Sequence, residues 1–249
     1  MLPRPRRRPH AIFHFHFSPR RGNFIDVARA DQAIDRFQFE RELLRCGMKY
    51  IAGVDEAGRG PLAGPVVAAA VVMPAIWIES GLPAELEGLN DSKQLSAGER
   101  EKFFTFLTSC GDVRLGIAGV ESGTIDAINI LQATHRAMNQ ALAQLRPEPE
   151  HVLVDGWHVG SVLFPQTALV QGDARSYSIA AASVLAKVTR DRVMLEYDRS
   201  YPAYGFAGHK GYGTAQHLAA LAEHGPCPIH RRSFSPLRPG QPELFPPQQ

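Results

Sequence analysis

The stretch that decides the fold is Tyr50-Ile51-Ala52-Gly53-Val54-Asp55-Glu56-Ala57-Gly58-Arg59-Gly60-Pro61-Leu62-Ala63-Gly64-Pro65. Its apolar start is typical of a buried strand, and the strand ends in two adjacent acids, Asp55 and Glu56. Neighbouring buried carboxylates repel each other, and a bound cation removes that cost. Mg²⁺ and Mn²⁺ prefer oxygen ligands, and the glycines that follow allow a backbone to approach a ligand closely. The alternative, a strand that ends in a solvated turn, is the commoner meaning of an isolated Asp-Glu pair.

Length and composition are those of a soluble globular protein with one sizeable domain. The chain has 249 residues, of which 44% are hydrophobic and 21% are charged. Cys46, Cys110 and Cys227 have no metal-binding spacing, which is typical of reduced thiols in the cytoplasm. No apolar run approaches the roughly 20 residues that a membrane span needs. We therefore expect a cytoplasmic protein, and we expect it to be a monomer.

Charge is unevenly distributed along the chain. Residues 1–30 carry seven arginines and one acid, whereas the remainder has a net charge of −4. The sequence therefore predicts a basic, disordered arm over residues 1–33, a folded domain over 34–235 and a flexible, proline-rich tail over 236–249. Any surface of the domain that binds nucleic acid must be local, because the total charge does not favour it.

The pattern of apolar residues between the arm and the tail predicts a mixed α/β fold around one sheet. Ser96 followed by Glu99 is a capping box that begins a helix, and Pro147 ends the clearest helical pattern. We expect further strands over 66–73, 113–120, 151–156 and 167–172, and helices over 34–46, 96–108, 124–145, 178–197 and 214–224.

Acids stand at three predicted strand ends. Asp55 and Glu56 end the first strand, Asp155 ends a later one, and Asp173 follows another. Ligands of α/β sheets bind beyond strand ends, where such side chains converge. Each aspartate alone is more often a turn residue, but four converging carboxylates need two divalent ions, which clamp the oxygens of a phosphoryl displacement.

A rival interpretation of the opening stretch is a dinucleotide-binding loop. Gly58-x-Gly60-x-x-Ala63 matches that fingerprint after a strand. Pro61 and Pro65 oppose the helix that the fingerprint requires, and two acids would face the pyrophosphate. We therefore disfavour it.

Taken in order, the motifs resemble those of bacterial ribonuclease HII, a type 2 ribonuclease H family, over about residues 37–236. Several motifs in the right order over this length make the resemblance highly specific. The matching segments are Gly53–Val66, Asn90–Ser96, Ile125-Asp126 with Asn129–Leu131, Val154–Gly156, Gly172-Asp173, Ser178–Ser183 with Ala186–Asp191, His209–Thr214 and His230–Phe234.

The resemblance implies a ribonuclease H-like mixed sheet flanked by helices, with a helical C-terminal extension. It implies an endonuclease that hydrolyses the RNA strand of RNA–DNA hybrids and incises 5′ of ribonucleotides embedded in DNA, as in ribonucleotide excision repair. Two Mn²⁺ or Mg²⁺ ions would serve a mechanism that leaves 5′-phosphate and 3′-hydroxyl ends. The acids implied as both catalytic and metal-binding are Asp55, Glu56, Asp155 and Asp173.

The resemblance also implies the residues that bind substrate. Gly58-Arg59-Gly60 would read the ribose 2′-hydroxyl, which distinguishes RNA from DNA. Tyr212 would stack on the sugar at the RNA–DNA junction, although by itself it could be an ordinary half-buried loop tyrosine. Ser92, Lys93 and Ser96 would contact phosphate, which positions a duplex without reading its sequence.

One departure from the family is visible, because Gln171 stands where the family often has lysine. Its neighbour Asp173 is unaffected, but a phosphate or structural contact could be weaker. In the helix that follows, we interpret Lys187 and Arg190 as a solvated face and Asp191 as the ion-pair partner of Lys187.

Two alternatives to the leading interpretation stay open at the level of sequence. One is a DNA-strand nuclease or resolvase of the same acidic fold type, which would have no 2′-hydroxyl for the Gly58-Arg59-Gly60 turn to read. The other is a catalytically inactive hybrid-binding protein, which a missing acid would favour. In the tail, Gln241, Leu244 and Phe245 resemble a short peptide that docks on the bacterial sliding clamp.

Overall fold

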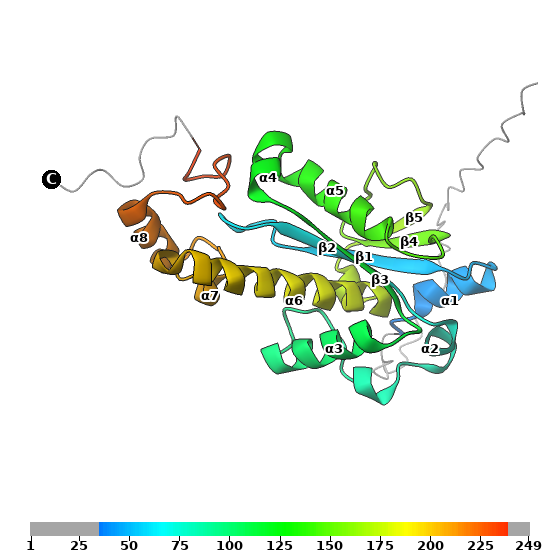
Figure 1. Cartoon of the computed structure of the whole chain (residues 1–249). Coiled ribbons are helices and arrows are strands. Elements are labelled where there is room, and N and C mark those ends of the chain that lie inside the picture. The colour runs from blue at the N-terminus through cyan, green and yellow to red at the C-terminus, as the bar shows by residue number, and fades with distance from the viewer. Residues whose placement is uncertain (1–34, 239–249) are drawn as a thin grey trace, which may run out of the picture. The chain divides into compact units, whose positions relative to one another are not determined.

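The structure, a computed structural model, describes residues 35–238, and all structural statements below concern that part (Figure 1). The predicted basic arm and the clamp-like peptide at Gln241, Leu244 and Phe245 lie outside the described residues. Among the described residues, no helix is both long and apolar enough to cross a membrane.

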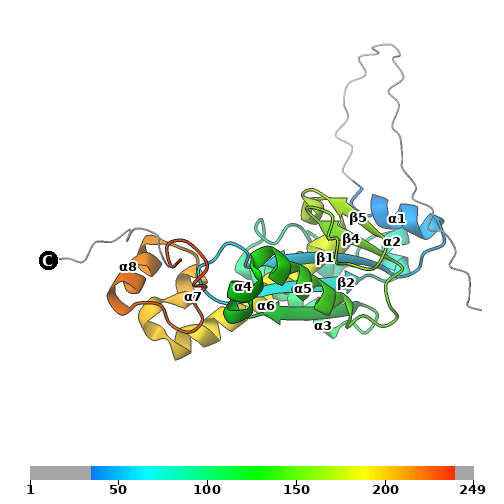
Figure 2. The same cartoon turned by 90° about the horizontal axis from the view of Figure 1, so that it is seen from above.

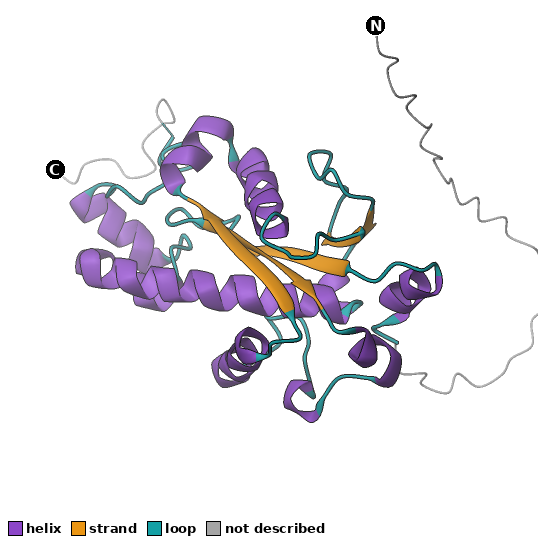
Figure 3. Cartoon of the chain, turned by 45° about the vertical axis from the view of Figure 1, so that its right-hand side comes forward, coloured by secondary structure: helices purple, strands orange, loops and turns teal. Residues whose placement is uncertain are grey.

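The centre of the fold is a five-stranded sheet in the order β3-β2-β1-β4-β5. Figure 3 shows the strands together in the middle of the molecule with helices around them. Strands β1 and β2 pair antiparallel, as do β2 and β3, whereas β4 runs parallel to β1 and to β5. Because β1 and β4 are parallel neighbours, their carboxyl ends lie at the same edge of the sheet. The strands are β1 (Ile51–Ala57), β2 (Val66–Val72), β3 (Arg114–Val120), β4 (His151–Asp155) and β5 (Gln166–Leu169).

Helices cover both faces of this sheet (Figure 1). Alternate residues of β2 belong to two different cores, with Ala69 and Val71 packed in the core that includes α6, and Ala68 and Ala70 in the core that includes α5. Burial on both faces explains why β2 is apolar at every position. One face carries α4 (Ser122–Ile128) and α5 (Ile130–Leu142). The other carries α1 (Gln38–Arg45), α2 (Ala75–Ser80), α3 (Ala97–Ser109) and α6 (Tyr177–Ser200).

Gly53 allows α6 to lie directly against β1. A Cβ at Gly53 would lie 2.2 Å from the carbonyl carbon of Ser178, so any side chain there would push the helix away. This contact brings the first turns of α6 beneath the strand end that carries Asp55.

The C-terminal part is helical, as predicted. It comprises the 3₁₀ turn η3 (Pro202–Tyr204), α7 (Phe206–His209) and α8 (Ala215–His224). Phe206 and Leu221 pack with Leu62 and Ala63 of the β1–β2 loop in a separate core. Figure 2 shows α7 and α8 beyond the end of the sheet, on the side opposite to β5.

Several predicted elements are confirmed, and others need correction. Ser96 forms the predicted capping box of α3, and β2 and α8 lie where we expected them. The single helix predicted over 124–145 is wrong, because Asn129 adopts a φ of 66° and its side chain caps a new helix by accepting from the Gln132 N–H. The strand predicted over 167–172 ends at Leu169, so Asp173 lies on the 3₁₀ turn η2 (Gly172–Ala174) and not at a strand end.

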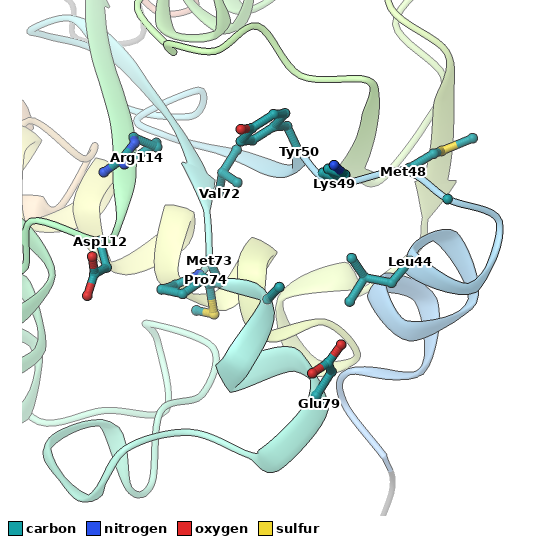
Figure 4. A pocket seen from close by; sticks show the side chains of 12 residues that line it. Leu44, Met48, Lys49, Tyr50, Val72, Met73, Pro74, Glu79, Asp112 and Arg114 are labelled. Carbon is teal, nitrogen blue, oxygen red and sulfur yellow. The ribbon is translucent and has the colours of Figure 1, made fainter.

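A pocket of about 480 Å³ lies at the N-terminal end of β1, away from Asp55 (Figure 4). Tyr50 and Lys49, just before β1, line it together with Val72 at the end of β2 and Arg114 at the start of β3. None of the predicted site residues lines this pocket. The predicted acids Asp55 and Glu56 instead lie at the C-terminal end of β1.

Candidate active site

Three aspartates meet at the carboxyl end of the central strands. One carboxylate oxygen from each of Asp55, Asp155 and Asp173 lies within 4.8 Å of the other two. Asp55 stands near the end of β1, Asp155 ends β4, and Asp173 comes from η2 just before α6. We call these three residues the aspartate cluster.

Backbone N–H groups hold each carboxylate of the aspartate cluster. One oxygen of each side chain accepts a hydrogen bond of 2.7–3.0 Å, which fixes its orientation. Asp55 also faces the hydroxyl of Ser183 on α6. The backbone donors are Glu56 to Asp55, Gly172 to Asp155 and Ala174 to Asp173.

Within residues 35–238, no buried cation balances the charge of the aspartate cluster. Burial raises the pKa of Asp55 well above its usual range, and repulsion from Glu56 and Asp155 adds to the shift. Burial and the Asp155 charge likewise raise the pKa of Asp173. Lys93 Nζ lies 3.7 Å from Asp173 Oδ2, but 79% of the Lys93 side chain is exposed, so water screens this cation. The cluster fits a divalent cation, since a hard ion with oxygen ligands would supply the missing charge.

Glu56 is the predicted acid that the structure leaves outside the cluster. Its carboxylate lies 3.2 Å from Arg59 Nη1. Burial raises the pKa of Glu56 and the Arg59 cation lowers it, while the charge of Asp155 acts in the same direction as burial. Glu56 is therefore close enough to feel the cluster, but its charge is partly balanced within the chain.

The Gly58-Arg59-Gly60 turn leaves β1 directly beside the aspartate cluster. Gly58 is buried with a φ of +94°, and a Cβ there would lie 2.0 Å from Arg190 Nε. Arg59 and Gly60 are exposed, and a Cβ at Gly60 would be 3.7 Å from the Tyr212 ring. Tyr212 itself is 47% exposed, so it is a surface side chain next to the turn.

The residues predicted to contact phosphate differ in exposure. The Ser92 side chain is buried, and its Oγ lies 2.9 Å from Ser183 Oγ. Ser96 Oγ accepts from the Glu99 N–H at the start of α3. Lys93 is exposed and close to the cluster. Gln171, where the family often has lysine, is exposed and adopts a left-handed φ of 55°.

Two buried arginines were not anticipated from the sequence as parts of the site. The interpretation of Arg190 as part of a solvated face is wrong, because its exposed fraction is 1%, and that of Arg231 is 0%. The predicted ion pair between Lys187 and Asp191 is confirmed at 2.8 Å. Helical periodicity could have found Arg190, which follows the buried Ser183 and Ala186 on one face of α6. Arg231 lies in the matching segment His230–Phe234, but neither periodicity nor spacing in that segment indicates that its side chain is buried.

The two arginines, which we call the arginine pair, hold the loop between β1 and β2. Arg190 donates to the Ala63, Pro65 and Lys210 carbonyls at 3.0–3.1 Å. Burial, together with the Arg190 charge, lowers the pKa of Arg231 to about 9. Both side chains therefore carry a buried positive charge at neutral pH.

A mixed sheet with an acidic cation site at the ends of two parallel central strands defines the class of metal-dependent, ribonuclease H-like nucleases. Residues 52–236 match the family model described as Ribonuclease HII. The chain is 54% identical over 196 residues to the Ribonuclease HII of Geobacter metallireducens, covering 79% of this chain and 88% of that protein. The chain belongs to the ribonuclease HII family, and it is an endonuclease that acts on RNA–DNA hybrids.

Solved structures agree with this assignment. The crystal structure of the ribonuclease H2 from Pyrococcus horikoshii is similar with a TM-score of 0.62 and 30% identity, covering 75% of this chain and 94% of that one. The RNase HII in the PCNA:RNase HII complex from Archaeoglobus fulgidus has a TM-score of 0.57, with 23% identity over 78% of this chain and 98% of that one. Bst-RNase HIII in complex with Mn²⁺ has a TM-score of 0.53, with 18% identity over 71% of this chain and 70% of that one. At these identities the last two comparisons establish the shared fold.

Proposed function

We propose that the chain incises the RNA strand of hybrids, and duplex DNA 5′ of an embedded ribonucleotide, leaving 5′-phosphate and 3′-hydroxyl ends. The observation that carries the proposal is the proximity of two features on β1. Asp55 belongs to a cluster whose negative charge is not compensated within residues 35–238, and the exposed Arg59–Gly60 turn follows within five residues. Chemistry and recognition of the ribose would then be joined by one rigid strand end.

The aspartates would act as ligands of Mn²⁺ or Mg²⁺, with Glu56 beside them. Two bound ions would supply an activated water and would neutralise the charge that develops at phosphorus. The chain contributes the fixed geometry, because backbone N–H groups already orient an oxygen of each aspartate. The raised pKa of Asp55 supports this role, since a ligand cation would relieve the same repulsion.

The exposed residues around the cluster would bind the substrate. The Gly58-Arg59-Gly60 turn would read the 2′-hydroxyl, and Tyr212, next to Gly60, would pack on the adjoining sugar. Lys93 would contact phosphate as a point charge. Ser92 and Ser96 would contribute less to phosphate binding than Lys93, because both hydroxyls already form hydrogen bonds within the protein.

The decisive experiment compares two 5′-labelled DNA duplexes of one sequence, with and without a single ribonucleotide. In Mn²⁺ or Mg²⁺ the full chain should cut the ribonucleotide-containing strand immediately 5′ of the ribonucleotide. In EDTA it should cut neither duplex. Asp55→Asn is the matched control, because it keeps the size of the side chain and removes its charge. Equal cutting of both duplexes, or cutting by the Asp55→Asn protein at the native rate, would contradict the proposal.

We further propose a partner for the tail and a cytoplasmic location. Gln241, Leu244 and Phe245 would insert into a preformed groove of a sliding clamp, as extended peptides do. A pull-down with purified clamp should retain the full chain and lose a version that lacks residues 241–245. Equal retention of the two proteins would refute the partner.

A further inference from the structure

The turn that would read the ribose is held from beneath by Arg231. Its Nη2 donates to the Gly58 carbonyl at 2.6 Å, and its Nη1 donates to the Arg59 carbonyl at 2.9 Å. Its Nε donates to the Gly64 carbonyl at 3.0 Å, so all three guanidinium nitrogens bind this loop. The side chain exposes none of its surface, so it cannot itself reach a substrate.

These contacts determine which way the backbone of the turn faces. In a trans peptide unit, the carbonyl and the N–H of the next residue point in opposite directions. The peptide bonds at Gly58-Arg59 and Arg59-Gly60 are trans. Because Arg231 draws the Gly58 and Arg59 carbonyls inward, the N–H groups of Arg59 and Gly60 point outward.

Both outward N–H groups are available to a ligand. Arg59 and Gly60 are exposed, and between residues 35 and 238 no acceptor receives a hydrogen bond from either backbone N–H. Successive N–H groups that point the same way form a small site for an oxygen acceptor. Asp55 lies four residues before Arg59, so the acceptor would belong to the nucleotide at the aspartate cluster.

We propose that Arg231 is a positioning residue that orients the Arg59 and Gly60 N–H groups toward the ribose 2′-oxygen of the substrate. This inference rests on the proposed function, and it adds the residue that makes the turn selective. A lysine could not replace Arg231, because a single ammonium nitrogen cannot span three carbonyls that the planar guanidinium bridges.

The backbone of Arg231 is anchored as firmly as its side chain. Its N–H donates to the Leu62 carbonyl at 2.8 Å, and the preceding residue forms a β-bridge with Ala63. On the other side, the N–H groups of Arg232 and Ser233 each donate to the Asp126 carboxylate at 2.9 Å. The segment is therefore built to keep the guanidinium in place, and Asp126 offers a second point at which to loosen it.

The test measures binding in an Asp55→Asn background of the full chain, in which cleavage is removed. The readout is the ratio of Kd values for the all-DNA duplex and for the same duplex with one ribonucleotide, in Mg²⁺. Arg231→Lys should lower this ratio about tenfold, which corresponds to about 1.4 kcal/mol, with little change in affinity for DNA. Asp126→Ala should lower it less, and Arg232→Lys, an exposed neighbour, should leave it unchanged.

The ratio separates positioning from a general loss of structure. Partial unfolding lowers the active fraction for both duplexes and leaves the ratio as it was. A native ratio in Arg231→Lys would overturn the inference while sparing the proposed function. If Arg231→Lys does not fold, Asp126→Ala decides, because a native ratio there would equally overturn the inference. If the Asp55→Asn background itself binds both duplexes alike, the reading of the ribose by the turn fails, and the inference fails with it.

Discussion

The aspartate cluster and the arginine pair both bury charge, but they differ in how completely the chain compensates it. Arg190 and Arg231 together donate six hydrogen bonds of 2.6–3.1 Å to backbone carbonyls. Each carboxylate of the aspartate cluster accepts one backbone N–H on one of its oxygens, and the exposed Lys93 is its neighbouring cation. A buried charge that the protein satisfies stabilises architecture, whereas one that it leaves unsatisfied marks the place for a ligand.

Removing one charge from the aspartate cluster should have the largest effect. Asp55→Asn should lower the rate of hybrid cleavage at least about a thousandfold, because it removes a cation ligand at the reacting centre. In EDTA the same variant should melt at or above the native Tm, since it removes repulsion from a buried cluster. Single-turnover cleavage and thermal unfolding measure the two effects. A Tm several degrees below the native value would show that the Asp55 charge is compensated after all.

Removing a charge from the arginine pair should have the opposite effect on stability. Arg231→Met removes a buried cation that binds three carbonyls, two of them buried, and we expect it to lower the free energy of unfolding by about 3–5 kcal/mol. Urea unfolding followed by circular dichroism measures this loss. Arg232→Met is the matched control, because the neighbouring side chain is exposed, and it should change stability by less than about 0.5 kcal/mol. Similar losses in the two variants would deny the arginine pair its structural role.

A divalent cation should stabilise the aspartate cluster and leave the arginine pair as it is. At a Mn²⁺ concentration about 100 times its Kd, binding should add about 2.7 kcal/mol to the free energy of unfolding. For a domain of this size that amounts to roughly 5–10 °C in Tm. Asp55→Asn should lose most of the gain, and Arg232→Met should keep it. A Mn²⁺ response that survives in Asp55→Asn would place the cation elsewhere.

The sequence could predict part of the aspartate cluster, because two of its acids follow apolar strands. Asp55 and Asp155 follow apolar runs, so strand periodicity alone placed them at one edge of the sheet. Asp173 was identified as an acid of the site but assigned to a strand end, because the turn of η2 depends on the left-handed Gln171. The break at Asn129 was missed for the same reason, since a single left-handed residue leaves the apolar spacing on both sides intact.

The arginine pair marks the limit of what sequence patterns can predict. Arg231 is separated from Gly58 by 173 positions, and its partners are backbone carbonyls, which exist at every residue. A charged residue in a glycine-poor segment is more often exposed than buried. Only the folded loop shows that three carbonyls converge where this guanidinium lies.

Two buried and uncharged histidines, His217 and His230, lie beside the arginine pair. His217 Nδ1 lies 2.9 Å from the Tyr212 carbonyl, which can only accept, so this nitrogen carries the proton. His217 Nε2 must then accept from His230 Nε2 at 3.0 Å. His230 Nδ1 in turn accepts from the Cys227 N–H at 2.9 Å. The chain is satisfied only with both imidazoles neutral, and it fixes the backbone of Tyr212.

This network predicts the smallest effect, a loss of stability in mild acid. Burial, followed by the neighbouring His217, lowers the pKa of His230 to about 4, whereas an unfolded histidine has a pKa of about 6.5. Between these values the unfolded chain binds the additional proton, so the stabilisation is complete above pH 6.5 and declines as the pH falls toward 4. The expected loss between pH 7 and 5 is roughly 1–2 kcal/mol.

The raised pKa values of the aspartate cluster act in the opposite sense, because protonation in acid relieves their repulsion. The histidine contribution must therefore be isolated by a variant. His230→Asn removes the titrating imidazole, so its Tm in EDTA should start lower at pH 7 and fall less toward pH 5 than the native Tm. Equal slopes for the two proteins would mean that His230 titrates normally in the folded state. In that case the buried network beside the arginine pair would not depend on neutral histidines, and protonation would leave the hold on Tyr212 unchanged.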